Sequence, residues 1–345
     1  SELIKSWEAG FDVRFLQNRL GLDFAWYKTN ATRQLLNLPL DPFAGYSSRK
    51  VNAGNIQNEG LEISLNGAIF QSNDPQGFNW NATAQFSLNR NKIIDLYPGV
   101  TLYDIKTLDA IQIVAAQGGY YGDIYGQTFL RVTDKESPHY GKVIVGEDGL
   151  PLISTEKSKV GNQSPDWMLG LTNSFSYKGF NLSFLVDFRI GGDIYSATAS
   201  SLHVRGNAAG TVVNGERREF VVPNTVVQED GRYVENKVPV TPQNYWERIG
   251  STGNYGLPEV FTYDATNIRL RNITLGYTFN KAMLKKTPFQ RLNLSATCNN
   301  VWMIHYNLPG IDPESVSATN TNATGFENGA APTSRSFTFN VTVGF

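Results

Sequence analysis

The sequence has little of the chemistry that holds metals or disulfides. It contains one cysteine, Cys298, in 345 residues, and three histidines, His139, His203 and His305, that lie far apart. One cysteine cannot form an internal disulfide, and zinc sites need ligands at close, regular spacing. We therefore expect no disulfide framework, no metal site and no cofactor.

Charge of one sign and long apolar runs are also missing. The chain has 30 Lys and Arg against 31 Asp and Glu, so it lacks the basic excess typical of nucleic-acid-binding proteins. Its longest apolar runs, such as 111–116, are far shorter than the roughly 20 residues of a membrane-spanning helix. Residues 1–10 show no signal-peptide pattern, so the chain is expected to be processed or a fragment.

What the sequence does contain is alternation with a period of two, which is typical of strands with one dry face. In residues 180–190, for example, apolar side chains at even positions alternate with mainly polar ones at odd positions. Almost no stretch follows the helical period. The sequence predicts about eleven strands, at 8–18, 20–30, 58–70, 77–89, 124–132, 140–146, 166–177, 179–190, 265–280, 290–303 and 333–345.

The connections between these strands alternate between short and long. The long ones lie near 31–57, 90–123, 147–165, 191–264 and 304–332. Outer-membrane barrels place short turns on the periplasmic side and long loops outside, and they carry aromatic girdles at both interfaces. Trp26, Trp80 and Trp302 lie near strand ends on the apolar face. The pattern predicts an all-β fold, an antiparallel transmembrane β-barrel.

The odd number of strands predicts an incomplete barrel. Eleven antiparallel strands begin and end on opposite sides, so they cannot close into the even-numbered barrel expected of a bacterial outer-membrane protein. An unpaired strand edge is not tolerated in lipid. About half of the barrel must therefore come from elsewhere.

Several motifs match one family. Val51-Asn-Ala-Gly-Asn-Ile-Gln-Asn-Glu-Gly-Leu-Glu62 resembles the N-x-G-x-I-x-N-x-G-x-E segment of TonB-linked outer-membrane transporters, and residues 7–12 resemble the segment one hairpin earlier. Residues 160–180, 191–196, 268–279 and 299–302 are similar to the SusC/RagA branch. Together these motifs span nearly the whole chain in family order.

The resemblance implies that residues 1–345 are the C-terminal part of a 22-stranded TonB-dependent transporter barrel. An N-terminal part outside these residues would supply a plug domain, the segment that contacts TonB and the other eleven strands. It also implies non-enzymatic import of oligosaccharides or oligopeptides across the bacterial outer membrane. A SusD-like surface lipoprotein would close the extracellular mouth, and outer-membrane lipid would surround the barrel.

Polar residues on the wet face are candidates for the lumen. We single out Glu62, Asp187 and Arg189, which either line a solute path or only form the polar wall that a water-filled barrel requires. Asp187 and Arg189 stand two residues apart on one face, close enough for an ion pair. Asp312 and Glu314 form a tight acidic pair in a loop near the mouth. We interpret this pair as a solvated turn, to which paired-carboxylate chemistry is the alternative.

Aromatic residues give two further expectations. Tyr120, Tyr121 and Tyr125 belong to a glycine-rich stretch, 118–126, and could stack on a sugar, although a turn that enters a strand is the other interpretation. The end of the sequence alternates and finishes on an aromatic ring, as expected of a barrel assembly signal. Its apolar residues are Phe337, Phe339, Val341, Val343 and Phe345.

Two other protein classes stay open. A secreted all-β carbohydrate-binding or glycoside-cleaving module would bury its apolar strand faces, whereas a barrel would expose them to lipid. A complete 16-stranded porin is disfavoured by the strand count and by the length of 191–264. Labelling with lipophilic probes would separate the first class from the transporter.

Overall fold

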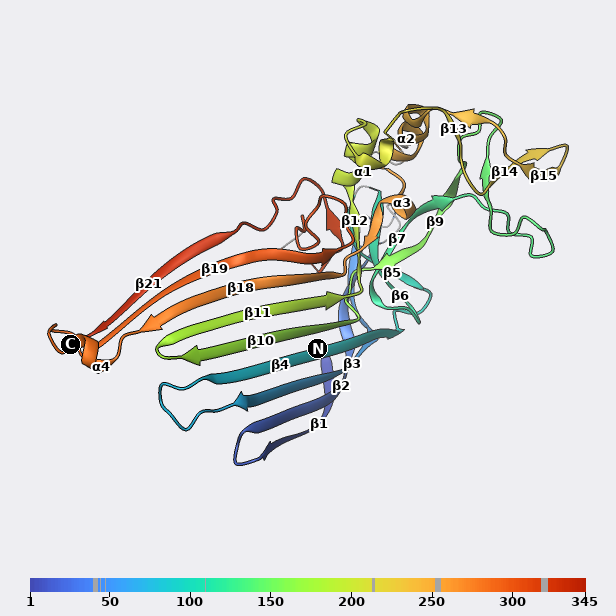
Figure 1. Ribbon diagram of the computed structural model, residues 1–345. Helices are drawn as coiled ribbons and strands as arrows, with labels where there is room; N and C mark the ends of the chain where they lie inside the picture. The colour runs from blue at the N-terminus through green and yellow to red at the C-terminus, as the bar shows by residue number, and fades with distance from the viewer. Residues whose placement is uncertain are drawn as a thin grey trace.

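The computed structural model describes the chain except for residues 40–42, 44, 47, 109, 213–214, 252–255 and 318–321. It consists of a long, curved sheet with an assembly of loops and small sheets at one end (Figure 1). The chain begins at the end of the sheet beside this loop assembly and finishes at the opposite end.

The large sheet contains nine antiparallel strands among the described residues, in the order β1-β2-β3-β4-β10-β11-β18-β19-β21. It is open, with β1 and β21 at its edges. The strands are β1 (Leu3–Phe15), β2 (Leu20–Pro39), β3 (Ser48–Phe70), β4 (Asn79–Asp95), β10 (Trp167–Tyr177), β11 (Phe180–Ile190), β18 (Asn267–Thr278), β19 (Arg291–Tyr306) and β21 (Ser336–Gly344). The prediction of a mainly β fold built on an antiparallel sheet is confirmed, but the described strands do not close into a barrel.

The predicted count of eleven strands in one sheet is wrong, and an equal division of a 22-stranded barrel is not confirmed. The strand expected at 124–132 is β7 (Tyr121–Phe129), which joins a separate sheet with β5 (Leu102–Leu108), β6 (Ile111–Ala116) and β9 (Ile153–Asn162). The one expected at 140–146 is reduced to β8 (Val143–Val145), beside β14 (Thr225–Glu229). Both belong to the loop assembly.

The register of the large sheet gathers apolar side chains on one face. One row of paired residues runs across seven strands: Phe11, Phe24, Ile63, Phe86, Leu169, Phe188 and Ile268. Another runs from Leu182 through Leu275 and Ala296 to Phe339 in the edge strand. Because a one-residue slip would turn every side chain of a strand to the other face, this alternation fixes the register.

Short turns close the hairpins at the end far from the loop assembly. The tightest is Lys178–Gly179 between β10 and β11, where both residues have positive φ, 48° and 88°. Two residues with positive φ form a type I′ turn, whose twist matches that of a hairpin. A Cβ at Gly179 would lie 2.7 Å from the carbonyl oxygen of Thr278, so the neighbouring strand also requires glycine there.

The loop assembly is built from three long connections, 96–166, 191–266 and 307–335. Besides the strands above it contains β12 (Asp193–Ser196), α1 (Ala197–Val204), a 3-10 turn (Ala209–Thr211), β13 (Phe220–Val221), β15 (Arg232–Glu235), β16 (Pro239–Val240), α2 (Pro242–Gly250), α3 (Pro258–Phe261), β17 (Thr262–Asp264) and β20 (Phe326–Glu327). The remaining helix, α4 (Lys281–Leu284), lies in the turn between β18 and β19. Across the described ranges, no helix has the length and apolar character needed to cross a membrane.

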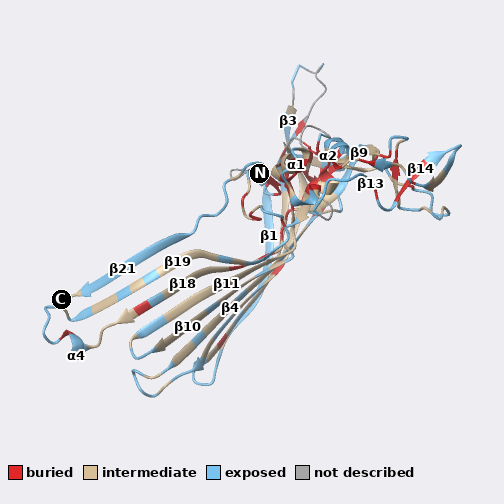
Figure 2. Cartoon of the chain, turned by 45° about the horizontal axis from the view of Figure 1, so that its top comes forward, coloured by how far each residue is buried: buried red, intermediate tan, exposed pale blue. Residues whose placement is uncertain are grey.

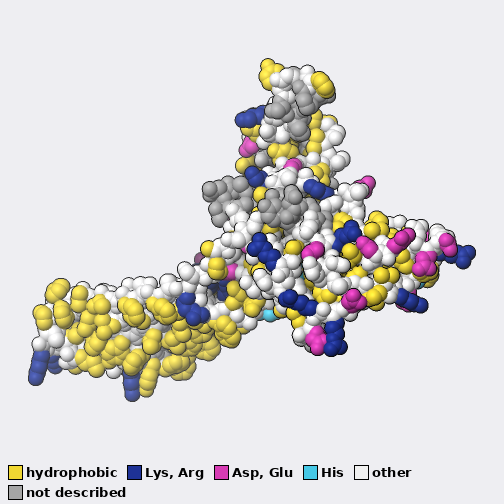
Figure 3. Space-filling model, turned by 90° about the horizontal axis from the view of Figure 1, so that it is seen from above, with side chains coloured by type: hydrophobic (Ala, Val, Ile, Leu, Met, Phe, Trp, Pro, Cys, Tyr) yellow, Lys and Arg dark blue, Asp and Glu magenta, His cyan; other side chains and the backbone are white. Residues whose placement is uncertain are grey.

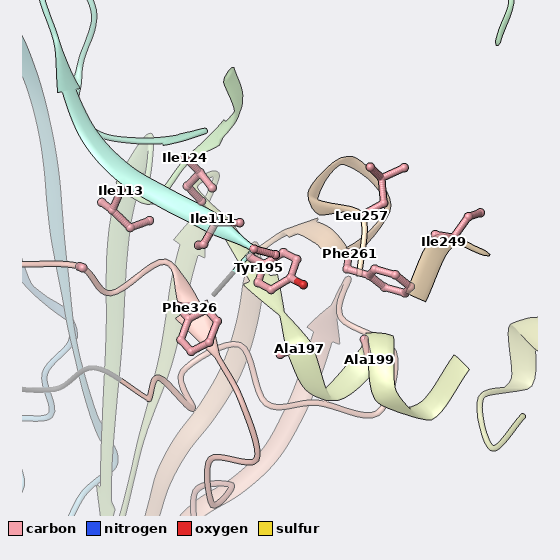
Figure 4. Packing of buried hydrophobic residues seen from close by; sticks show 12 residues of the cluster. Ile111, Ile113, Ile124, Tyr195, Ala197, Ala199, Ile249, Leu257, Phe261 and Phe326 are labelled. Carbon is pink, nitrogen blue, oxygen red and sulfur yellow. The ribbon is translucent and has the colours of Figure 1, made fainter. Parts of the chain in front are cut away.

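The main hydrophobic core lies in the loop assembly and not in the large sheet. All three long connections contribute to it: Ile111 and Ile124 from the first, Tyr195 and Phe261 from the second, and Phe326 from the third (Figure 4). Buried residues are accordingly concentrated at this end of the molecule, while the large sheet is mostly half-buried or exposed (Figure 2).

Candidate functional site

The two faces of the large sheet differ in chemistry. No layer of described residues packs over the apolar face: Phe180 is 56% exposed and Phe339 is 79% exposed. In Figure 3 apolar side chains cover most of the sheet on the side in view. The opposite face carries the polar residues of each strand. We call these two surfaces the apolar face and the polar face.

Glu62, one of the predicted luminal residues, lies on the polar face of β3, where its backbone neighbours are Ala25 and Ser87. Together with Asp23 and Gln85 it borders an open hollow of about 410 Å³. Both polar and apolar residues line the hollow, and it fits both interpretations of Glu62, as part of a solute path or as wall.

Five charged residues form what we call the arginine–carboxylate cluster: Asp187, Arg269, Arg271, Asp312 and Glu314. Arg271 is an extra residue in β18, because the pairing with β11 and with β19 shifts there. Such a bulge re-aims a side chain. Arg271 Nε donates to Asp187 Oδ2 at 2.8 Å, and its Nη1 donates to Glu314 Oε2 at 2.7 Å. Arg269 makes a bidentate pair with Asp312.

The cluster fastens the connection 307–335 to the wall of the sheet. Arg269 and Asp312 are both buried, with 5% of each side chain exposed. Burial alone would raise the pKa of Asp312, but hydrogen bonds from Arg269 and from the hydroxyl and N–H of Thr333 outweigh it and hold that pKa well below its ordinary value. Asp312 and Glu314 are thus paired with arginines. The expectation of a solvated turn was wrong, because these arginines of β18 bind the two carboxylates.

The expected ion pair between Asp187 and Arg189 does not form. Asp187 accepts from Arg271, while Arg189 Nη2 donates to the backbone oxygen of Gln163 at 3.1 Å. The Nε atom of Arg189 is buried without a hydrogen-bond partner. The bulge in β18 explains the difference, because it supplies Asp187 with an arginine from the neighbouring strand.

Three polar side chains, all buried or half-buried, each join two of the three long connections to one another. Gln163 bonds to the backbone of 322–325 through three contacts of 2.6 to 3.0 Å. Glu259 accepts from the N–H of Phe129 at 2.7 Å and pairs with Arg131. Glu327 accepts from the hydroxyls of Ser196 and Thr198 at the start of α1. The loop assembly is therefore one interlocked unit.

The three candidate tyrosines do not form one platform. Tyr120 is 45% exposed and borders a polar pocket of about 340 Å³ with Asn162 and Asp166, where Lys159 lies 5.1 Å from its ring centre. The hydroxyl of Tyr121 accepts from Asn322 at 3.0 Å, and Tyr125 lies within β7. Gly118 and Gly119 form a turn before β7, whereas Gly122 and Gly126 lie within the strand. Of the three tyrosines, Tyr120 is the one that borders this polar pocket.

The C-terminal candidates lie on the apolar face of β21. Phe337, Phe339, Val341 and Val343 are between 42% and 79% exposed. The ring of Phe345 lies 5.5 Å from that of Phe289, in the turn between β18 and β19. They thus lie in the positions that the alternation predicted.

Sequence reasoning missed Gln163, Glu259 and Glu327 as connecting residues, and Arg269 and Arg271 as partners of the acidic pair. The alternation Ile268-Arg-Leu-Arg271 placed two arginines in one strand, which was the available signal. In the part of the chain that the structure describes, no group of three or more His, Cys, Asp or Glu side chains is placed to hold a metal ion.

Similar proteins are known. TonB-dependent receptor P3 of Formosa agariphila is 27% identical over the whole of this chain, and TonB-dependent receptor SusC of Bacteroides thetaiotaomicron is 24% identical over 93% of it. The chain spans 34% and 30% of these relatives, about a third of their length. Both are receptors, not enzymes, which agrees with the prediction of no catalytic activity.

The fold also matches a solved structure, that of the RagAB peptide transporter, with a TM-score of 0.69 and 18% identity. The match covers 99% of this chain and 35% of the solved one. The sequence profile of the family described as "TonB dependent receptor-like, beta-barrel" matches residues 1–301. The family predicted from the motifs is confirmed: the chain belongs to the TonB dependent receptor-like β-barrel family.

Proposed function

We propose that this chain forms part of the barrel wall and the extracellular loops of a TonB-linked importer of nutrient oligomers, either oligosaccharides or oligopeptides. As a member of its family the chain is a protein of the bacterial outer membrane. Strands β1 and β21 would pair with further strands of the same receptor, whose N-terminal part would also provide the plug and the contact with TonB. Paired edges satisfy the backbone groups that lipid cannot.

One observation carries the proposal: a continuous apolar face, opposite a polar face, that no other part of the chain the structure describes covers. A soluble sandwich buries such a face against a second sheet. An outer-membrane barrel instead turns it to lipid and keeps polar residues, here Glu62, Asp187 and Arg189, inside. The same observation argues against a secreted carbohydrate-binding or glycoside-cleaving module.

The substrate would enter past the loop assembly. The pocket beside Tyr120 combines a ring with amide and carboxylate groups, a chemistry that suits sugars and peptides alike. To test the function, cells that carry the full receptor should take up labelled oligopeptides or oligosaccharides of about two to ten units in a TonB-dependent way. Equal uptake of both classes without the receptor would refute the proposal.

The second and third long connections are our candidates for docking a SusD-like lipoprotein. Both lie at the end of the sheet that would face outward, and the interlocked loop assembly gives them a defined shape. Deletion of much of 205–240, which precedes α2, should weaken co-purification of the lipoprotein and leave assembly of the barrel intact. Unchanged co-purification would contradict docking by this segment.

We further propose that the apolar residues of β21 and Phe345 serve as an assembly signal. An exposed aromatic ring at the short-turn end suits the membrane interface. Phe345→Asp should lower the amount of receptor in the outer membrane and leave uptake per assembled molecule normal. Normal assembly with impaired uptake would place this residue in the transport path instead.

A further inference from the structure

The short-turn end of the large sheet carries an excess of positive charge. Residues 16–19, 71–78, 178–179 and 279–291 contain six basic side chains and one acidic side chain, Asp74, which accepts from the N–H of Gln76 at 2.9 Å. The basic residues are Arg19, Lys178, Lys281, Lys285, Lys286 and Arg291. Figure 3 shows dark blue side chains and no magenta ones at the end of the sheet farthest from the loop assembly.

Three of these residues, Lys281, Lys285 and Lys286, lie together in and just after α4. All three are exposed, and no ion pair found within the described ranges involves any of them. At the opposite end of the sheet, beside the loop assembly, basic side chains do have acidic partners: Lys28 pairs with Glu59, and Arg90 pairs with Asp166. Among the described residues, these three lysines are thus left without an acidic partner.

Apolar groups lie directly beside these lysines. Met283 of α4 is 54% exposed, and its sulfur lies 3.5 Å from the hydroxyl of Tyr277, whose ring packs 4.7 Å from that of Phe180. Leu284 is buried and holds α4 against the sheet. Exposed apolar groups next to flexible cations are typical of a membrane interface, where rings sit at headgroup depth and lysines extend to the phosphates.

We propose that Lys281, Lys285 and Lys286, together with Arg291, form a binding surface for anionic phospholipid headgroups, those of phosphatidylglycerol, in the leaflet that the short turns face. The choice of lipid follows from charge complementarity, since clustered basic residues attract anionic lipid and the segment 279–291 that carries all four contains no Asp or Glu. The orientation rests on the proposed function, in which short turns face the periplasm.

The test uses the full receptor in nanodiscs made of equal parts phosphatidylethanolamine and phosphatidylglycerol. After mild detergent extraction, mass spectrometry measures which lipids stay bound. We expect phosphatidylglycerol to be enriched several-fold over phosphatidylethanolamine. In the triple variant Lys281→Gln, Lys285→Gln, Lys286→Gln this enrichment should fall to near one.

A matched control removes three exposed lysines of the loop assembly by the changes Lys135→Gln, Lys157→Gln and Lys237→Gln. The control should keep the enrichment of the unmodified receptor. A second measurement needs no variant: raising the salt concentration from about 0.05 to 0.5 M should weaken the enrichment, because the screening length shrinks well below 10 Å.

Equal enrichment in the triple variant and the unmodified receptor would overturn the proposal, as would a preference for lipid A over phosphatidylglycerol in a mixed disc. Failure of the proposed function would look different. In that case the receptor would not insert and would retain no lipid in any variant, whereas failure of this inference alone would leave insertion intact without a lipid preference.

Discussion

The large sheet and the loop assembly are ordered by different forces. In the sheet, order comes from antiparallel backbone pairing across nine strands, and the apolar side chains remain exposed on one face. In the loop assembly, order comes from a buried apolar core and from charged or polar side chains that bridge separate connections. The described part of the chain leaves the apolar face of the sheet uncovered, whereas the loop assembly carries its own core.

The arginine–carboxylate cluster is where the two regions meet, and breaking it should have the largest effect. Removing one partner of a buried ion pair costs about 3–5 kcal/mol, because the other charge stays buried and unpaired. We expect Arg269→Met to release the segment 307–335 from the wall, measured as faster amide hydrogen exchange there. Adding Asp312→Asn to Arg269→Met, which removes the unpaired charge and keeps an oxygen that accepts from Thr333, should restore part of the protection. Unchanged exchange in the single variant would show that the segment is held elsewhere.

The two faces of the sheet should respond unequally to the same substitution. In the full receptor refolded into bilayers, Phe184→Arg places a charge on the apolar face and should lower the free energy of unfolding by about 2–4 kcal/mol. Ser183→Arg, one residue away on the polar face, should cost much less. Denaturant titrations of both variants test this, and equal costs would abolish the assignment of faces.

The smallest expected effect is that of lowering the pH on the contacts of Asp312. The pKa of Asp312 in the folded protein is below its ordinary value, so its stabilising contribution is complete above about pH 3.9 and is lost only as the pH falls through the lower folded value. A spin label at the exposed position Ala331→Cys, in a Cys298→Ser background, should show no change in mobility between pH 7 and pH 5. Mobility that rises already at pH 5 would mean that Asp312 is not held by Arg269 and Thr333.

Alternation made the sheet predictable from sequence. Residues 180–190 and 337–345 place apolar side chains on one face and mainly polar ones on the other, so each strand shows its faces in its own residues. The same rule failed for β6, where Ile111 and Ile113 are fully buried and Val114 and Ala115 are buried as well. A strand that is covered on both faces is apolar at successive positions, so it shows no alternation by which the sequence would reveal it as a strand.

The contacts of the candidate site were less predictable, because they join residues far apart in the chain. Asp312 was recognised as part of an acidic pair, but its partner Arg269 lies 43 residues earlier. The pairing of Asp187 with Arg271 depends on a bulge that alternation does not reveal. Gln163 carries no charge and was not a candidate, yet its amide joins two loops.

The most direct test of the account is to map which side chains of the full, membrane-inserted receptor contact lipid, by photolabelling with a lipophilic carbene probe and mass spectrometry. We expect labels on the even-numbered residues of 180–190 and on the odd-numbered residues of 337–343, with few on Ser183 or Asp187 between them. Labels spread equally over both faces, or absent from Phe184 and Phe339, would contradict a lipid-facing sheet.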